Sequence, residues 1–134
     1  MTAETNIKTV QMVYEAFGRG DVAGIIEFTA DDVDWASEAA GTAAPWYGPH
    51  HGHDGVAAFF TAFGSAMEVE EFTPLCFAGT DTEVLTVVRF AVKSRSTGRR
   101  VAMHLHHYFR FRDGKIDYYR GSEDTAQTAS VLAG

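Results

Sequence analysis

The stretch that decides the fold is residues 101–124, VAMHLHHYFRFRDGKIDYYRGSED. It predicts two strands joined at Asp113-Gly114, a dipeptide that accepts the positive φ of a tight hairpin. In the first strand apolar residues alternate with basic and polar ones, and a period of two places the apolar set on one face. That set comprises Val101, Met103, Leu105, His107, Phe109 and Phe111. His107 is therefore the single titratable ring on an otherwise apolar face.

Length, charge and cysteine content restrict the class of protein. A chain of 134 residues predicts one domain, 1–134, which is large enough to bury a core without disulfides. The net charge of −7 argues against a general nucleic-acid-binding protein. The lone Cys76 suits a reducing compartment, and the sequence shows no signal-peptide pattern and no long apolar run. We therefore expect a cytoplasmic protein that does not enter a membrane.

Upstream of the hairpin, helical spacing dominates first and strand-like alternation second. The helical pattern predicts three helices, over 6–18, 22–28 and 54–67. The strand pattern predicts three strands, over 33–37, 72–78 and 84–95. Asp31-Asp32 is expected to interrupt the second helix before the first strand begins. Residues 68–71 are expected to form an acidic connection. Helices followed by long strands predict an α+β fold.

The segment from Glu38 to Gly52 is the one long irregular stretch. It is rich in Gly, Ala and Pro, and it carries Trp46, Tyr47 and two histidines. Loops of this length in a compact domain often act as lids or binding loops. We therefore expect this segment to border a binding site.

The register of the two hairpins decides what faces His107. If Ser96 pairs with Arg99, Val88 lies opposite His107, and Arg89 lies on the other face of the sheet. That arrangement makes Arg89 a poor candidate for a pocket residue.

The last strand has two possible registers. A two-residue turn at Asp113-Gly114 places Tyr118 and Arg120 beside His107. A three-residue turn with Gly114 in a bulge instead places Tyr119, Gly121 and Glu123 there. The alternation pattern alone leaves both registers open.

Four segments carry a resemblance that covers nearly the whole chain. They are YEAFGRGDVAGIIEFTADDVDW (14–35), HHGHDGVAAFF (50–60), HHYFRFRDGKI (106–116) and EDTA (123–126). Together they resemble the SnoaL-like branch of the nuclear-transport-factor-2-like superfamily, which is similar to ketosteroid isomerases, polyketide cyclases and small dehydratases. Because this fold hosts many functions, the resemblance is informative about the fold and weak about the activity.

The resemblance implies a cone-shaped roll. A strongly curved, mainly antiparallel sheet wraps against the N-terminal helices and encloses a deep pocket. The bulged register would then hold, with Tyr119, Gly121 and Glu123 facing inward. It also implies a homodimer that pairs through the outer sheet face, whose exposed row is Arg89, His104, His106 and Tyr108.

At the catalytic positions of ketosteroid isomerases the match is partial. Tyr14 sits where a first-helix tyrosine donates a hydrogen bond to the substrate oxyanion. The general-base aspartate corresponds to Ser37, which cannot act as a base, and the protonated aspartate corresponds to His107. Steroid isomerisation by that mechanism is therefore not expected. SnoaL-like proteins resemble this chain in commonly having histidine at the place of His107.

Three residues are candidates for chemistry. His107 is a candidate general acid or base because imidazole titrates near neutral pH, and the alternative is a core histidine bonded to a neighbour. Tyr14 is a candidate donor to an oxyanion, or else a core ring with its hydroxyl at the edge. Glu123 is a candidate to orient or protonate His107, although carboxylates at strand ends are ordinarily solvated.

Aromatic and polar residues near the expected pocket are candidates for ligand binding. They are Trp35, Ser37, Trp46, His50, His51, Phe59, Phe63, Phe109 and Tyr119. Most aromatic residues at such spacings are simply core, and Trp46 in the loop is the main exception. The cluster of His50, His51 and His53 also suggests zinc, but zinc sites usually draw ligands from several elements. The Gly-Pro context favours a lid, so no metal is expected.

These observations predict a protein with a pocket for a small apolar or cyclic organic molecule. We expect an isomerase, cyclase or dehydratase that works by acid–base chemistry without a cofactor. The alternative is a non-catalytic ligand-binding or dimeric assembly module of the same fold. The two differ in whether a second polar group converges on the cavity opposite His107.

Overall fold

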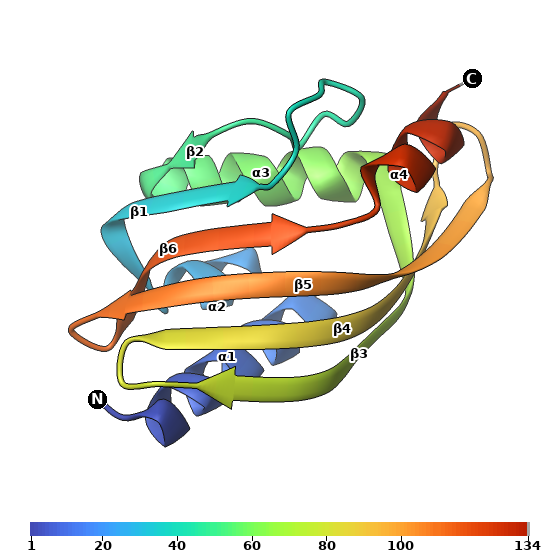
Figure 1. Cartoon of the computed structure of the whole chain (residues 1–134). Helices are drawn as coiled ribbons and strands as arrows, with labels where there is room; N and C mark the ends of the chain where they lie inside the picture. Colours follow the sequence, from blue (N-terminus) through green and yellow to red (C-terminus); the bar gives the residue numbers. More distant parts are fainter. Residues whose placement is uncertain (134) are drawn as a thin grey trace.

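The computed structural model describes residues 1–133 (Figure 1). In chain order, the elements are α1 (Ala3–Gly18), α2 (Val22–Ile26), β1 (Thr29–Ser37), β2 (His50–His51), α3 (Gly52–Ala66), β3 (Met67–Gly79), β4 (Glu83–Ser94), β5 (Arg100–Arg112), β6 (Lys115–Ser122) and α4 (Thr125–Leu132). No helix in this part of the chain is long and apolar enough to cross a membrane.

The strands form one sheet in the order β2-β1-β6-β5-β4-β3. All neighbours are antiparallel except β1 and β6, which run parallel. Helices α1, α2 and α3 lie together on one side of the sheet, and the long strands β3, β4 and β5 bend across them (Figure 1). The sequence-based prediction of an α+β roll with N-terminal helices on a curved, mainly antiparallel sheet is confirmed.

The β5–β6 hairpin combines features of both registers that the sequence allows. Its turn has two residues, because Arg112 pairs with Lys115, and both turn residues have positive φ (52° at Asp113 and 79° at Gly114). A bulge then follows at Asp117, so that Arg110 pairs with Tyr118. The extra residue flips the faces of the remaining strand. His107 therefore pairs with Gly121, as the bulged alternative predicts, although the bulge lies in the strand and not in the turn.

The β4–β5 hairpin differs from the prediction by two residues. Lys93 pairs with Arg100, and the backbone N–H of Ser94 donates to the carbonyl of Arg99 across a loop that includes Gly98 at φ 74°. Thr86, and not Val88, consequently lies opposite His107. A shift of two residues preserves the faces, so Arg89 lies on the outer face as predicted, where it pairs with Glu71.

Two acidic segments are strands where the sequence predicts interruptions. β1 begins at Thr29 and continues through Asp31 and Asp32, whose side chains are exposed, so their charges stay in water. Glu68–Glu71 lies within β3, where the carboxylate of Glu71 pairs with Arg89 of the neighbouring strand β4 and that of Glu70 with Arg100 of β5. Because these charges are solvated or paired, the backbone of both segments can form hydrogen bonds with the adjacent strand.

The C-terminal helix α4 was not predicted, and it closes one end of the roll. Asp124 caps its first turn by accepting a hydrogen bond from the backbone N–H of Gln127 (3.2 Å). Its last turn is held by the β4–β5 hairpin, where Thr97 donates to the Val131 carbonyl (2.6 Å) and Arg99 to the Ser130 carbonyl (3.0 Å). These contacts fix α4 beside the cavity described next.

Candidate active site

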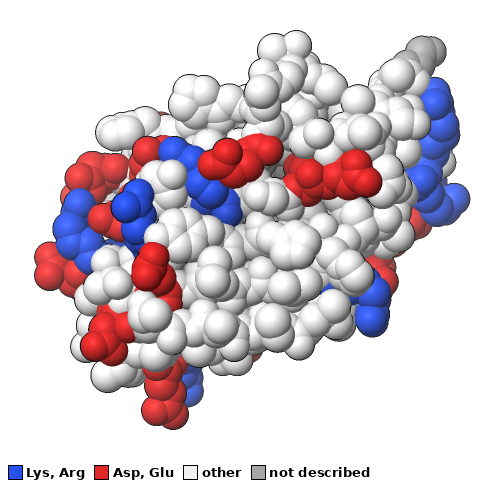
Figure 2. Space-filling view, in the orientation of Figure 1, with Lys and Arg blue, Asp and Glu red and all other residues white. Residues whose placement is uncertain are grey.

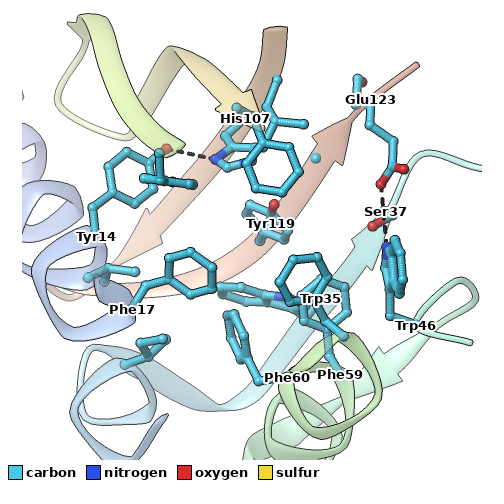
Figure 3. Close-up of a pocket in the computed structure, with 18 of the residues that line it drawn as sticks. Tyr14, Phe17, Trp35, Ser37, Trp46, Phe59, Phe60, His107, Tyr119 and Glu123 are labelled. Carbon is cyan, nitrogen blue, oxygen red and sulfur yellow. Dashed lines mark hydrogen bonds between the residues drawn. The ribbon is translucent and has the colours of Figure 1, made fainter. Parts of the chain in front are cut away.

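A cavity of about 90 Å³ lies between the helices and the concave face of the sheet (Figure 3). It is several times larger than the roughly 10–15 Å³ that one water requires. Ten residues expected at a site line it, namely Tyr14, Trp35, Ser37, Trp46, Phe59, Phe63, His107, Phe109, Tyr119 and Glu123. The other lining residues are Val13, Phe17, Ile25, Phe60, Met67, Phe72, Phe90, Val92, Leu105, Gly121, Ser122 and Thr128. The walls are thus mostly aromatic and aliphatic.

His107 projects from the middle of β5 into this cavity and is 9% exposed. Its Nδ1 lies 2.7 Å from the hydroxyl of Tyr14, which comes from α1. The same hydroxyl lies 2.6 Å from Oγ1 of Thr86, the residue opposite His107 on β4. A helix and two strands therefore place three polar side chains in a row at one end of the cavity, where Figure 3 shows the Tyr14–His107 bond.

Burial decides the charge of these groups. Loss of solvent lowers the pKa of His107 to about 3, with a smaller contribution from the nearby charge of His106. Burial also raises the pKa of Tyr14, although its hydrogen bond with Thr86 acts in the opposite direction. The pKa of Tyr119 is likewise raised by burial. At neutral pH the inner end of the cavity is thus polar but uncharged.

Glu123 lines the cavity away from this row, and among the described residues its hydrogen bonds go to groups other than His107. Its carboxylate accepts hydrogen bonds from Tyr47 (2.9 Å), from the indole of Trp46 (3.4 Å) and from the hydroxyl of Thr128. The carboxylate thereby joins the loop after β1 to helix α4. The residue that orients His107 in this structure is Tyr14.

The aromatic wall opposite α1 is built on Trp35. Its indole stacks on the ring of Tyr119 at a centroid distance of 4.0 Å and meets the edge of Phe59 at 6.0 Å. Gly121 makes room for this stack, because a Cβ there would overlap the hydroxyl of Tyr119 and lie 3.2 Å from Cδ2 of His107. The missing side chain lets Tyr119 and His107 share one wall of the cavity.

The loop histidines lie outside the cavity lining. Nε2 of His50 is 3.0 Å from the carbonyl of Trp46, whereas Nε2 of His53 is 3.2 Å from the carbonyl of Thr29. His51 is exposed, at the start of α3. The three rings have separate surroundings, so this placement does not support closure of His50 or His51 over a ligand. Within residues 1–133, no three His, Cys, Asp or Glu side chains are grouped to hold a metal ion.

Sequence reasoning missed Thr86 and three of the phenylalanines that line the cavity, Phe17, Phe60 and Phe72. Thr86 lies among the inward-facing positions of a strand, but only the true register of β4 against β5 brings it beside Tyr14. The phenylalanines follow the helical and strand periodicities that also describe ordinary core residues. No local signal separates the two roles.

The family model of the SnoaL-like domain matches residues 10–119, which include Tyr14, Trp35 and His107. The chain belongs to the SnoaL-like family. A comparison with curated protein sequences found no match.

Solved structures show the same fold. An NTF2-like protein of unknown function from Burkholderia pseudomallei is 27% identical, with a TM-score of 0.89, and the match covers 97% of this SnoaL-like chain and 98% of that chain. TerC, co-crystallised with polyporic acid, is 21% identical with a TM-score of 0.84 over 97% and 99% of the two chains. An LEH-like epoxide hydrolase from M. tuberculosis is 17% identical with a TM-score of 0.74 over 97% and 90%. The last two likenesses establish the fold alone.

The lowered pKa of His107 predicts a loss of stability in mild acid. Histidine in an unfolded chain titrates near about 6.5, whereas His107 in the folded protein stays neutral down to about pH 3. Between these values the unfolded state binds more protons, so stability falls as the pH falls through this window. One such group costs roughly 2 kcal/mol between about pH 7.5 and about pH 5. Urea unfolding at both pH values should show a smaller loss for His107→Gln than for the wild type, and equal losses would contradict the prediction.

The crowding at Gly121 predicts that Gly121→Ala disturbs the cavity wall. The added methyl must displace the Tyr119 ring from its stack on Trp35, and overpacking of this kind costs about 1–3 kcal/mol. We expect a lower Tm and an altered near-ultraviolet circular dichroism spectrum. The matched control is Gly64→Ala in α3, where a new Cβ meets no atom within 4 Å. A Gly121→Ala protein as stable as this control would refute the steric argument.

Proposed function

We propose that this SnoaL-like protein binds a small, largely apolar or cyclic organic molecule in its cavity. It then acts on that molecule by acid–base chemistry without a cofactor, as an isomerase, a cyclase or a dehydratase. The observation that carries the proposal is the hydrogen bond between Tyr14 and His107 on the wall of an otherwise apolar cavity. His107 would pass its Nε2 proton to a ligand oxygen while Nδ1 takes up the hydroxyl proton of Tyr14, whose oxygen keeps its hydrogen bond with Thr86, and the reverse transfers would return both protons.

A neutral imidazole suits such a role. In the low dielectric of the cavity, a hydrogen bond from His107 to a ligand oxygen gains strength as negative charge develops on that oxygen. The hydroxyl oxygen of Tyr14 lies between His107 and Thr86 in the resting protein, which is why we assign Tyr14 an indirect role.

Further polar groups converge on the same cavity. Ser37, Tyr119 and Glu123 line it together with His107, and they come from β1, β6 and the segment after β6. A ligand in the cavity would therefore lie near more than one polar group. Catalysis requires a second polar group, whereas simple binding does not. This arrangement supports the enzyme over the non-catalytic binding module. TerC, a protein of the same fold crystallised with polyporic acid, supports an organic ligand.

The proposal is tested by a thermal-shift survey of small cyclic carbonyl compounds, followed by assays of turnover for those that bind. Ligands at about 100 times Kd should stabilise the protein by about 2.7 kcal/mol and raise its Tm. His107→Gln should lower turnover by roughly 10²–10⁴-fold, the usual contribution of a positioned acid or base.

The matched control is His53→Gln, which changes a histidine of α3 that lies outside the cavity lining. Turnover by His107→Gln at the wild-type rate would refute the catalytic role. Binding without any turnover by the wild type would instead establish the non-catalytic module.

We also propose that the protein forms a homodimer through the outer face of the sheet. Figure 2 shows this face with uncharged residues across its centre and charged residues of both signs toward its edges. Leu85 of β4 is 54% exposed there, beside Tyr108 of β5. Covering an exposed apolar side chain on such a face favours association.

Analytical ultracentrifugation should therefore show a wild-type dimer and a Leu85→Glu monomer. Ala23→Glu, which places the same charge on the exposed surface of α2, should remain dimeric. A wild-type monomer at micromolar concentrations would exclude this interface.

A further inference from the structure

The hydroxyl of Thr86 is the member of the polar row that lies farthest from His107 along its hydrogen bonds. Thr86 is 2% exposed, and within the described residues its hydroxyl has one hydrogen-bond partner, the oxygen of Tyr14 at 2.6 Å. The Tyr14 oxygen in turn lies 2.7 Å from Nδ1 of His107. Three polar groups thus share two short hydrogen bonds in a dry environment.

The number of available protons determines which group donates and which accepts in each of these two hydrogen bonds. The Thr86 hydroxyl proton needs an acceptor, and Tyr14 supplies one. The single hydroxyl proton of Tyr14 then points to its other neighbour, Nδ1 of His107, which accepts it. The reverse direction would leave the buried Thr86 proton without an acceptor, which is unfavourable. The neutral ring of His107 therefore carries its own proton on Nε2.

Nε2 of His107 faces the cavity. It has no hydrogen-bond partner within residues 1–133, yet it is not sealed from the cavity in the way that Nε1 of Trp35 is. The ring thus offers an N–H donor to whatever occupies the cavity. Among residues 1–133, no lysine or arginine lines the cavity, and the one carboxylate that does, Glu123, already accepts from three donors.

We propose that Tyr14 and Thr86 are positioning residues that together fix the proton of His107 on Nε2, and that this makes the cavity selective for uncharged ligands that carry a hydrogen-bond acceptor. This proposal rests on the cavity being the binding site of the proposed function. A carboxylate ligand would be buried without a cationic partner, and the carboxylate that could face an ammonium ligand, Glu123, is already bound by three donors, so burial of either charge is costly. An apolar ligand without an acceptor would leave the Nε2 proton unpaired.

Nitrogen NMR of protein labelled with ¹⁵N-histidine tests the position of the proton. In the wild type, Nε2 should show the signal of a protonated nitrogen and Nδ1 that of an acceptor, with His107→Gln identifying the resonances. Tyr14→Phe removes the hydroxyl that donates to Nδ1, so the Nδ1 signal should shift and the Nδ1–H form should appear.

Two variants control for effects on folding. Thr86→Ser keeps the hydroxyl that bonds to Tyr14 and should show the wild-type spectrum. Thr29→Val removes another buried threonine hydroxyl, which donates to the Ile26 carbonyl, and should leave the His107 signals unchanged. A proton on Nδ1 in the wild type, or an unchanged spectrum in Tyr14→Phe, would overturn the proposal.

A matched ligand pair tests the selectivity in the same samples. Cyclohexanone has a carbonyl oxygen where methylenecyclohexane has a CH₂ group of similar size. The ketone should bind at least about tenfold more tightly and shift the Nε2 signal, and cyclohexylammonium should not bind. Equal affinities for ketone and alkene would refute the selectivity. A correct tautomer and correct selectivity without turnover would leave this proposal standing while the proposed catalysis fails.

Discussion

The hydrogen bond between Tyr14 and His107 joins the first helix to the middle of the sheet, and it does so inside the apolar core. Both partners are nearly sealed from water, so neither can exchange the bond for solvent without exposing the cavity. The position of α1 on the sheet consequently determines the orientation of the imidazole, and neither can change without the other. The residues that define the cavity pack around this bond, with Phe72 and Phe109 meeting the ring of Tyr14 at centroid distances of 5.0 and 6.3 Å.

The sequence predicts the face of each strand better than the pairing of its residues. Alternation places His107 among apolar neighbours, and that conclusion survives an error of two residues in the β4–β5 register because the side-chain period is two. The predicted cross-strand partner of His107 is wrong, because Thr86 and not Val88 lies opposite it. In β6 the bulge at Asp117 reverses the faces, and no local pattern announces it. The resemblance to a family, and not the alternation, indicates that Tyr119 and Gly121 point inward.

The candidate site was predictable to the extent that its residues follow a period. Tyr14 and the aromatic wall follow helical or strand spacing, and the structure brings them together around one cavity. Glu123 lines that cavity as well, but its three donors come from the loop and from α4, an element without a clear signal in the sequence. The loop histidines suggest a site because three stand close together along the chain. In space, their ring nitrogens have different partners.

The surroundings of the cavity are of two kinds. Near His107 they are regular elements, with Tyr14 and His107 lining the cavity from α1 and β5 and Thr86 of β4 bonded behind them. Near Glu123 they are an irregular loop, which supplies Trp46 and Tyr47, and the terminal helix, all hydrogen-bonded to one carboxylate. Loops tolerate insertions and substitutions that strands do not. Mutations near Glu123 can thus change the shape of the cavity while the row of Tyr14, Thr86 and His107 stays intact, so this region is the natural place to redesign the scaffold.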